Sequence, residues 1–137
     1  MLRIFLDANT LLSGLLFEGN ESILLELGGI GLCRLVTNEY VVEETKRTLG
    51  RENFGLSSEE IVFLQGYIYR CVDVIDNPST SDIGEYCDAL NDKKDLPILL
   101  GCIGSQCDYL VTGDKELLSC KLVSSIKTKK MLKILGI

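Results

Sequence analysis

The sequence predicts an α/β protein of three layers, in which helices cover both faces of a central parallel sheet of four to five strands. Short apolar runs of strand length alternate along the chain with segments whose apolar residues recur at helical spacing. Residues 2–6 form a nearly continuous apolar run, as expected for a central parallel strand buried on both faces. Since no repeat or linker interrupts the sequence, we expect a single domain over residues 1–137.

The expected strands follow from these apolar runs and from the turn residues between them. They cover residues 2–6, 32–36, 71–75 and 109–112, with a fifth at 122–124. The first helix runs to about residue 17 with Asn9 or Thr10 as its cap, and a loop at 28–31 follows the second. Thr37 or Asn38 opens the third helix, and the capping box Ser57-Ser-Glu-Glu60 opens the fourth. The first expected helix ends at about residue 17, and the third extends to residue 49. The other expected helices cover residues 21–27, 57–69, 83–90, 95–105, 115–118 and 128–135.

The composition excludes several classes of chemistry. The chain has no histidine, which rules out serine–histidine triads, cysteine–histidine pairs and histidine-held zinc. Its six cysteines include no C-x-x-C pair, and we expect them to be reduced and mostly buried. The sequence has neither a signal-peptide pattern nor an apolar run long enough to span a membrane, so we expect a cytoplasmic protein. Any catalysis must then use carboxylates, lysine, cysteine, hydroxyl groups or a metal ion.

Two aspartates follow expected strands directly. Asp7 comes after the first strand, and Asp114 comes after the fourth strand and Gly113. Ligands of open parallel sheets bind beyond the carboxyl ends of the strands, so these two acids are candidate site residues. The alternative for each is a plain helix cap.

Two further acids belong to helices. Glu44 and its neighbour Glu43 point about 100° apart on one helix, and spacing alone does not choose between them. Asp95 begins another helix, where it is either a site residue or a cap, and the same applies to Asp92.

Three segments together resemble the PIN-domain family. They are Leu6-Asp-Ala-Asn-Thr-Leu-Leu-Ser-Gly14, Val42-Glu-Glu-Thr-Lys-Arg-Thr-Leu49, and the pair Asp95-Leu-Pro-Ile-Leu-Leu-Gly-Cys102 with Cys107-Asp-Tyr-Leu-Val-Thr-Gly-Asp-Lys-Glu-Leu-Leu118. The likeness runs from Leu2 to about Leu122 in the expected order, and it favours Glu44 over Glu43. Glu116 stands where many relatives have aspartate, which leaves open whether a fifth acid joins the site.

The resemblance implies a nuclease that holds Mg²⁺ or Mn²⁺ through carboxylates. Hard oxygen ligands without nitrogen or thiolate select these cations, and a cation offsets the repulsion among clustered acids. Asp7 and Asp114 would be the core ligands, with Asp95 and Glu44 completing the site directly or through water. Asn9 and Thr112 are candidate hydrogen-bonding partners of these carboxylates, although each residue type is also common in caps and turns.

The resemblance also implies an RNA substrate and, in many small members, a toxin role with an antitoxin peptide and a homodimer. An apolar stripe in the early helices hints at an interface, although such a stripe belongs to the core more often than not. It consists of Leu11, Leu12, Leu15, Leu16 and Phe17. Residues 1–120 hold 9 basic and 20 acidic residues, whereas residues 121–137 hold five lysines and no acid. These lysines either approach an RNA backbone or belong to a solvated helix end whose dipole favours positive charge. They are Lys121, Lys127, Lys129, Lys130 and Lys133.

Two other functions fit the sequence. A PIN-like module with weak or no catalysis, kept for binding RNA or protein, would preserve the fold without needing all four acids. A phosphohydrolase with Asp7 as its nucleophile usually needs a second acid two residues later, where this chain has Asn9.

Overall fold

The computed structural model describes all of residues 1–137 and has a five-stranded parallel sheet at its centre. The strands are β1 (Arg3–Leu6), β2 (Arg34–Asn38), β3 (Val72–Ile75), β4 (Tyr109–Val111) and β5 (Ser125–Ile126). Their order across the sheet is β3-β2-β1-β4-β5. The chain thus builds outward from β1 to β3 and then returns to the other side of β1, so the order reverses between β1 and β4.

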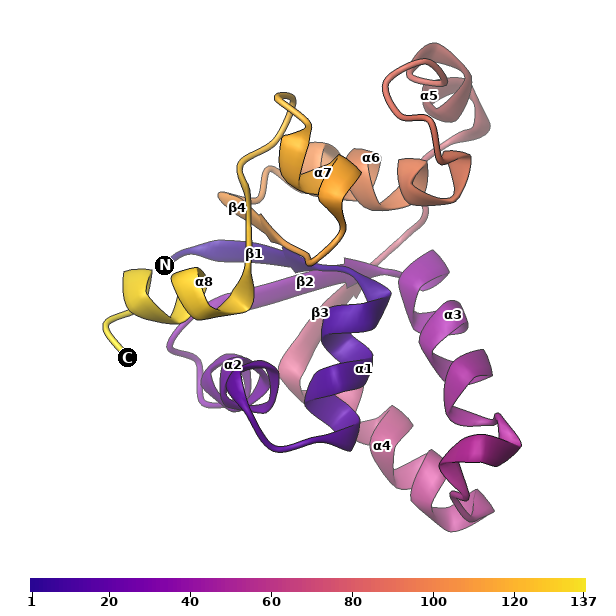
Figure 1. Ribbon diagram of the computed structural model, residues 1–137, viewed down its shortest axis with the longest axis vertical. Helices are drawn as coiled ribbons and strands as arrows, with labels where there is room; N and C mark the ends of the chain where they lie inside the picture. The colour runs from indigo at the N-terminus through magenta and orange to yellow at the C-terminus, as the bar shows by residue number, and fades with distance from the viewer.

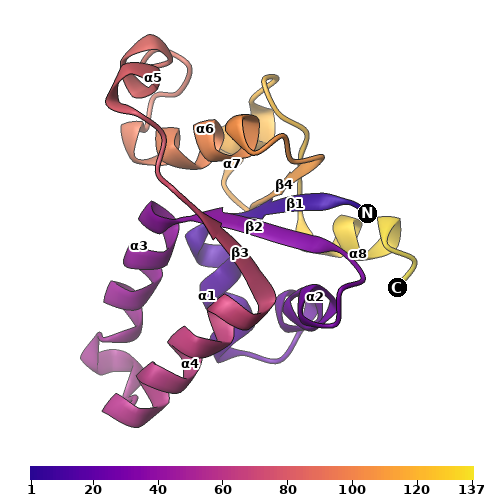
Figure 2. The same cartoon turned by 180° about the vertical axis from the view of Figure 1, so that it is seen from behind.

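Helices cover both faces of this sheet (Figures 1 and 2). They are α1 (Ala8–Leu16), α2 (Asn20–Gly29), α3 (Glu39–Leu49), α4 (Ser58–Cys71), α5 (Thr80–Glu85), α6 (Leu96–Gly104), α7 (Lys115–Ser119) and α8 (Thr128–Ile134). Two short 3-10 helices, Glu52–Phe54 and Lys93–Asp95, precede α4 and α6. The helices α5, α6 and α7 lie on one side, and α1, α2, α4 and α8 lie on the other, which confirms the three-layer prediction (Figure 1). None of the helices combines the length and apolar composition of a membrane span.

The core surrounds β1, as its continuous apolar run predicts. Ile4, Phe5 and Leu6 are fully buried, and so are the facing residues of β2 and, apart from the half-buried Tyr109, of β4. A strand with helices on both faces has no solvent side, which explains why its residues do not alternate between apolar and polar. The central strand is therefore rigidly held up to its carboxyl end, where Asp7 follows.

Two predicted helix starts have different outcomes. The capping box at Ser57 is confirmed, because Ser57 and Glu60 exchange side-chain to backbone hydrogen bonds of 3.0 and 3.1 Å. The predicted caps Asn9 and Thr10 are wrong for α1. Asp7 is the cap, and its side chain accepts the backbone N–H of Thr10.

Two strand predictions are wrong in their bounds. β2 begins at Arg34 rather than at residue 32, because the N–H of Leu32 still bonds to the Leu27 carbonyl at the end of α2. The helix α2 accordingly includes two of the glycines expected in a loop at 28–31. The fifth strand is Ser125–Ile126 rather than 122–124, because the N–H of Thr112 pairs with the Ile126 carbonyl.

The helix expected at 83–90 is also displaced. It is α5, which begins at Thr80 and ends at Glu85. Ser79 fixes the start, since its hydroxyl oxygen accepts the backbone N–H of Asp82 at 3.1 Å. A serine inside the turn sequence therefore opens the helix earlier than the apolar spacing indicates.

Candidate active site

Asp7 lies between β1 and α1, where two hydrogen bonds fix its carboxylate. Oδ1 accepts the backbone N–H of Thr10 at 2.9 Å, and Oδ2 accepts the hydroxyl of Thr112 at 2.5 Å. The residue is only 5% exposed. A buried carboxylate needs such donors to offset the water that it has lost. Asp7 is thus a helix cap and an oriented acid at once, so the two alternatives for this residue are compatible.

Asp114 stands at the end of the adjacent strand and is joined to Asp7 through one hydroxyl. Thr112 Oγ1 donates to Asp7 and accepts the backbone N–H of Asp114 at 3.1 Å. The Asp114 carboxylate also caps α7 by accepting a backbone N–H of that helix at 2.9 Å. Leu6 pairs with Val111 across the two strands, so both acids lie where the strand order reverses. This is the usual position of a ligand site in such a sheet.

Asp95 differs from these two aspartates because its carboxylate caps nothing. It occupies the cap position of α6 but accepts no backbone N–H there. Burial is the main reason that the pKa of its carboxyl rises to about 6. The charges of four acids add to this rise in pKa: Asp114, Asp92, Asp7 and Glu44. The fold therefore brings acids from several separate segments within electrostatic range of one half-buried carboxyl.

The structure separates Glu44 from Glu43 on α3. Glu43 points into solvent, with 62% of its side chain exposed, and lies 4.0 Å from Lys46 Nζ. Glu44 is half-buried, and its charge raises the pKa of Asp95. Glu44 is thus the member of the pair whose charge reaches Asp95. We call Asp7, Glu44, Asp95 and Asp114 the acidic cluster.

Asn38 connects the two helices that carry Glu44 and Asp95. Its Oδ1 accepts the N–H of Val41 at 3.1 Å and caps α3, while its Nδ2 donates to the Pro97 carbonyl at 2.9 Å in the first turn of α6. The close packing at this point requires a glycine. A Cβ on Gly101 would stand 2.7 Å from Asn38 Nδ2, closer than real Cβ atoms approach their neighbours.

Glu116 and Asp92 hold the turn before α6, and the charge of Asp92 also contributes to the rise in the pKa of Asp95. The two carboxylate oxygens of Glu116 accept the backbone N–H groups of Asn91 and Asp92 at 2.9 and 3.0 Å. These bonds lower the pKa of Glu116, with the bond from Asp92 contributing most. The Asp92 carboxylate in turn accepts the N–H of Lys94 at 3.0 Å. Both acids therefore help to place Asp95, which begins the next helix.

Tyr40 is a residue that the sequence reasoning missed. Burial raises the pKa of its hydroxyl, and the charges of Glu44, Asp95 and Asp92 raise that pKa further. The phenol therefore lies within electrostatic range of the acidic cluster and stays protonated at neutral pH. Its spacing was the available signal, because residues four apart share one face of a helix and Tyr40 precedes Glu44 by four.

Of the two predicted hydrogen-bonding partners, the structure brings only Thr112 to a carboxylate. Asn9 is exposed on α1 and contributes no hydrogen bond to the acidic cluster. The side chains also do not yet form a complete cation site. No group of three acidic or cysteine side chains lies close enough together to surround one ion.

The protein has a parallel three-layer fold with acids at the point where the strand order reverses. Comparison with known families identifies the class of protein that has this arrangement. The PIN domain family model matches residues 3–116, so the chain belongs to the PIN-domain family. PIN domains are generally nucleases, and they typically use divalent metal ions. A search of the curated proteins finds no match.

Solved structures share the fold. PAE2754 from Pyrobaculum aerophilum aligns with a TM-score of 0.66 and 17% identity, over 98% of this chain and 96% of that one. VapBC2 from Rickettsia felis, bound to a DNA fragment from its promoter, aligns with a TM-score of 0.72 and 16% identity. That alignment covers 92% of this chain and 98% of the other. At these identities, the likeness establishes the architecture alone.

Proposed function

We propose that the protein is a metal-dependent endoribonuclease whose active site is the acidic cluster. The observation that carries the proposal is the Asp95 carboxyl, which accepts no capping bond and whose pKa is raised to about 6 by burial and then by the charges of neighbouring acids. Keeping an uncompensated carboxyl beside like charges is unfavourable unless a cation offsets them. Membership in a family of nucleases supports the same function.

The donor set fits Mg²⁺ or Mn²⁺. The acidic cluster offers only carboxylate oxygens, and the chain has no histidine to compete for a softer metal. Asp7 and Asp114 would hold the ion from the strand ends, and Asp95 and Glu44 would close the site directly or through water. When bound, such an ion supplies charge stabilisation for a phosphodiester and activates water for attack.

The chain's own residues would orient this chemistry. Thr112 fixes Asp7 and the backbone of Asp114 relative to each other, so both carboxylates stay in place when a phosphate enters. Asn38 and Glu116 hold the helices and the turn that carry Glu44 and Asp95. The protonated Tyr40 hydroxyl adds a hydrogen-bond donor beside the carboxylates.

Cleavage of labelled single-stranded and structured RNA in Mg²⁺ or Mn²⁺ tests the proposal. We expect cleavage by the wild type that EDTA abolishes and that both Asp7→Asn and Asp114→Asn lose. Glu43→Gln is the matched control, because Glu43 faces solvent, and it should cleave normally. Absence of cleavage across diverse RNAs, with RNA binding retained, would identify a binding module instead.

A phosphohydrolase with Asp7 as nucleophile fits this chain less well than the metal-dependent nuclease does. The position two residues later holds the exposed Asn9 rather than an acid. A phospho-aspartate trapped on Asp7 would overturn this argument.

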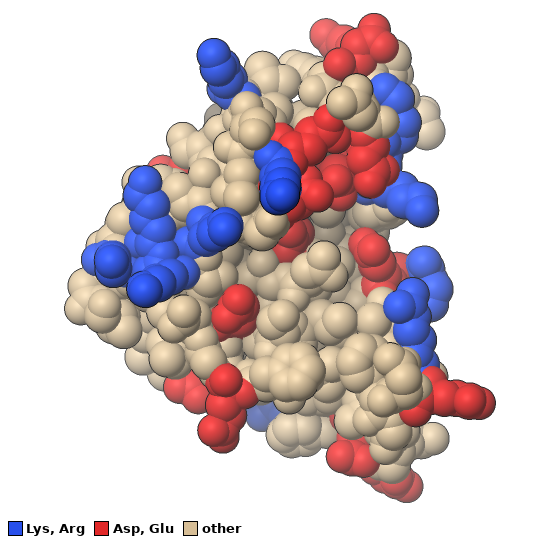
Figure 3. Space-filling model, in the orientation of Figure 1, with Lys and Arg blue, Asp and Glu red and all other residues tan.

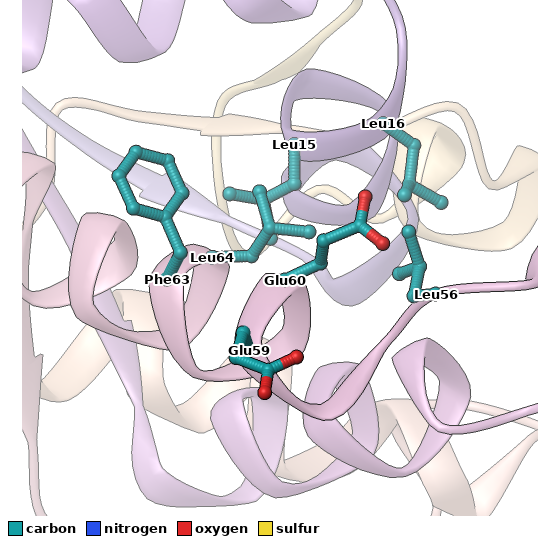
Figure 4. Close-up of a pocket in the computed structure, with 7 residues that line it drawn as sticks. All are labelled: Leu15, Leu16, Leu56, Glu59, Glu60, Phe63 and Leu64. Atoms are coloured by element: carbon teal, nitrogen blue, oxygen red, sulfur yellow. The ribbon is translucent and has the colours of Figure 1, made fainter.

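We further propose that the protein is the toxin of a toxin–antitoxin pair in the cytoplasm. The fold shared with VapBC2 supports an antitoxin peptide as partner. A hollow of about 510 Å³ lies between α1 and the start of α4. Five apolar side chains and two acids line it (Figure 4). Its lining is Leu15, Leu16, Leu56, Glu59, Glu60, Phe63 and Leu64.

This hollow suits an amphipathic peptide with apolar side chains and flanking lysine or arginine residues. The predicted apolar stripe divides accordingly: Leu11 is fully buried core, whereas Leu15 and Leu16 line the hollow and Phe17 is 66% exposed. We expect Phe63→Ser to weaken capture of a co-expressed antitoxin without affecting RNA cleavage. Ultracentrifugation of the chain alone tests the expected homodimer, and a Phe63→Ser variant that only becomes monomeric would assign the hollow to a second copy.

A further inference from the structure

Four exposed lysines surround one hollow beside the acidic cluster. Lys127, Lys129, Lys130 and Lys133 line an open hollow of about 670 Å³, together with Leu118, Ser125 and Ile126. We call these four lysines the lysine surface. Lys121, the fifth lysine of this region, lies apart from them and lines a different hollow. Neither salt bridge of the protein uses any of the four.

The helix dipole does not explain these lysines. Only Lys133 lies in the last turn of α8, where a positive charge is favourable. Lys127 is the cap residue, and Lys129 and Lys130 follow in the first turn, where the dipole opposes a positive charge. The helix dipole therefore disfavours a positive charge at three of the four positions, so it does not account for the grouping of these lysines.

The strand register places the lysine surface next to the acidic cluster. Leu6 pairs with Val111, and Val111 pairs with Ile126, so the residues that follow them, Asp7 and Lys127, stand at the same edge of the sheet. Adjacent strands are about 4.8 Å apart, which puts the two backbones roughly 10 Å from each other. Figure 3 shows the blue lysine area and the red acidic area on one face of the molecule.

The charge of the rest of the molecule makes this surface important. Residues 1–120 carry 9 basic and 20 acidic residues, and residues 121–137 carry five lysines and no acid. A phosphate backbone is repelled by the first part and attracted by the second. An RNA strand that reaches the acidic cluster can therefore gain electrostatic affinity from the nearby lysine surface.

We propose that single-stranded RNA runs from the acidic cluster across the end of β5 and that the lysine surface binds its phosphates on one side of the cleavage point. This inference rests on the proposed function. The half-buried Leu118 and Ile126 offer apolar contact to bases, and no aromatic side chain lines the hollow. The surface thus binds the backbone with little choice among bases.

RNA binding without divalent cation tests the lysine surface separately from catalysis. Fluorescence anisotropy of a labelled single-stranded RNA in EDTA compares the wild type with Lys129→Gln/Lys130→Gln/Lys133→Gln over a range of salt concentrations. Each lost phosphate contact lowers the slope of log K against log salt by about 0.7 for a single strand, so we expect a loss of about 2. Circular dichroism checks that the exposed substitutions leave the fold intact.

The matched control removes the same charge elsewhere. Arg34→Gln/Arg51→Gln/Arg70→Gln changes three exposed basic residues outside the lysine surface and should leave the slope nearly unchanged. Equal losses in both triple variants would show that net charge alone matters and would overturn the proposal. Undetectable RNA binding by the wild type would overturn it as well.

A second readout connects the lysine surface to the acidic cluster. In RNA cleavage, the lysine variant should raise KM about tenfold or more while kcat stays near the wild-type value. A fall in kcat at unchanged KM would contradict the proposal that the lysine surface binds the RNA backbone. If the wild type binds RNA but never cleaves it, the proposed nuclease function fails while the lysine surface stands.

Discussion

The acidic cluster and the lysine surface lie at the same edge of the sheet but are built differently. Asp7 and Asp114 are tied into the fold by hydrogen bonds to Thr112 and to helix backbones. The lysines are exposed and form no ion pair within the protein. The comparison indicates that the first region fixes the position of reacting groups and the second supplies affinity. Changes in the first should alter the rate and the fold, and changes in the second should alter binding only.

The sharpest test within the acidic cluster compares two adjacent glutamates. Glu44→Gln removes a carboxylate that faces Asp95, whereas Glu43→Gln removes one that faces solvent. We expect the first to reduce RNA cleavage on the order of 10²-fold and the second to have almost no effect. Steady-state cleavage at saturating Mn²⁺ measures both. Equal activities would remove Glu44 from the acidic cluster.

Thr112→Val tests the bond between the two strand-end acids. It leaves an oxygen of Asp7 and the N–H of Asp114 without their shared partner. We expect a loss of about 1–3 kcal/mol in the free energy of unfolding and a fall of roughly 10–100-fold in cleavage. Urea denaturation and cleavage rates measure these effects.

Thr45→Val is its control, because this buried hydroxyl bonds only to the Val41 carbonyl of its own helix. Its cleavage rate should stay near that of the wild type. If both threonine variants cleave normally, the hydroxyl bridge has no part in orienting the acids.

Glu116→Gln examines the turn that places Asp95. The amide keeps one acceptor and turns a donor toward one of the two backbone N–H groups that Glu116 now binds. We expect about tenfold weaker Mn²⁺ binding, measured by calorimetry, while RNA affinity in EDTA is retained. The exposed Glu85→Gln serves as control. Unchanged Mn²⁺ binding would show that the turn holds its place without Glu116.

The smallest expected effect is a pH dependence of stability from Asp95. Its folded pKa of about 6 lies above the ordinary aspartate value, so the folded state binds the proton more tightly than the unfolded chain does. In EDTA, this contribution to stability is complete below about pH 4 and is lost as the pH rises through 6. Asp95→Asn should therefore gain Tm relative to the wild type between pH 4 and 7. A constant difference in Tm would show that the Asp95 pKa is ordinary.

Much of the fold follows from local patterns in the sequence. The apolar run before Asp7 predicts the central strand, and the capping box at Ser57 predicts the start of α4. The errors occur where long-range pairing decides. Residues 122–124 have strand character, yet β5 lies at Ser125–Ile126 because pairing with β4 sets its position.

The site was predictable only in part for the same reason. Strand ends and the family resemblance point to the acids, but neither reveals how each carboxylate is engaged. Glu116 resembles a site acid in sequence and instead binds two backbone N–H groups. Tyr40 lies near the acidic cluster through the packing of α3, which a scan for charged motifs does not detect. Hydrogen bonding and burial, rather than residue type, make these distinctions.

The most direct test of the central claim is the initial rate of RNA cleavage as a function of Mn²⁺ concentration for wild type, Asp95→Asn and Asp88→Asn. Asp88 is an exposed acid whose charge is not among those that shift the Asp95 pKa, so its variant controls for net charge. The account predicts saturable, Mn²⁺-dependent cleavage by the wild type and Asp88→Asn, and a loss of at least about tenfold in Asp95→Asn. Cleavage that is independent of Mn²⁺, or equal in all three proteins, would contradict it.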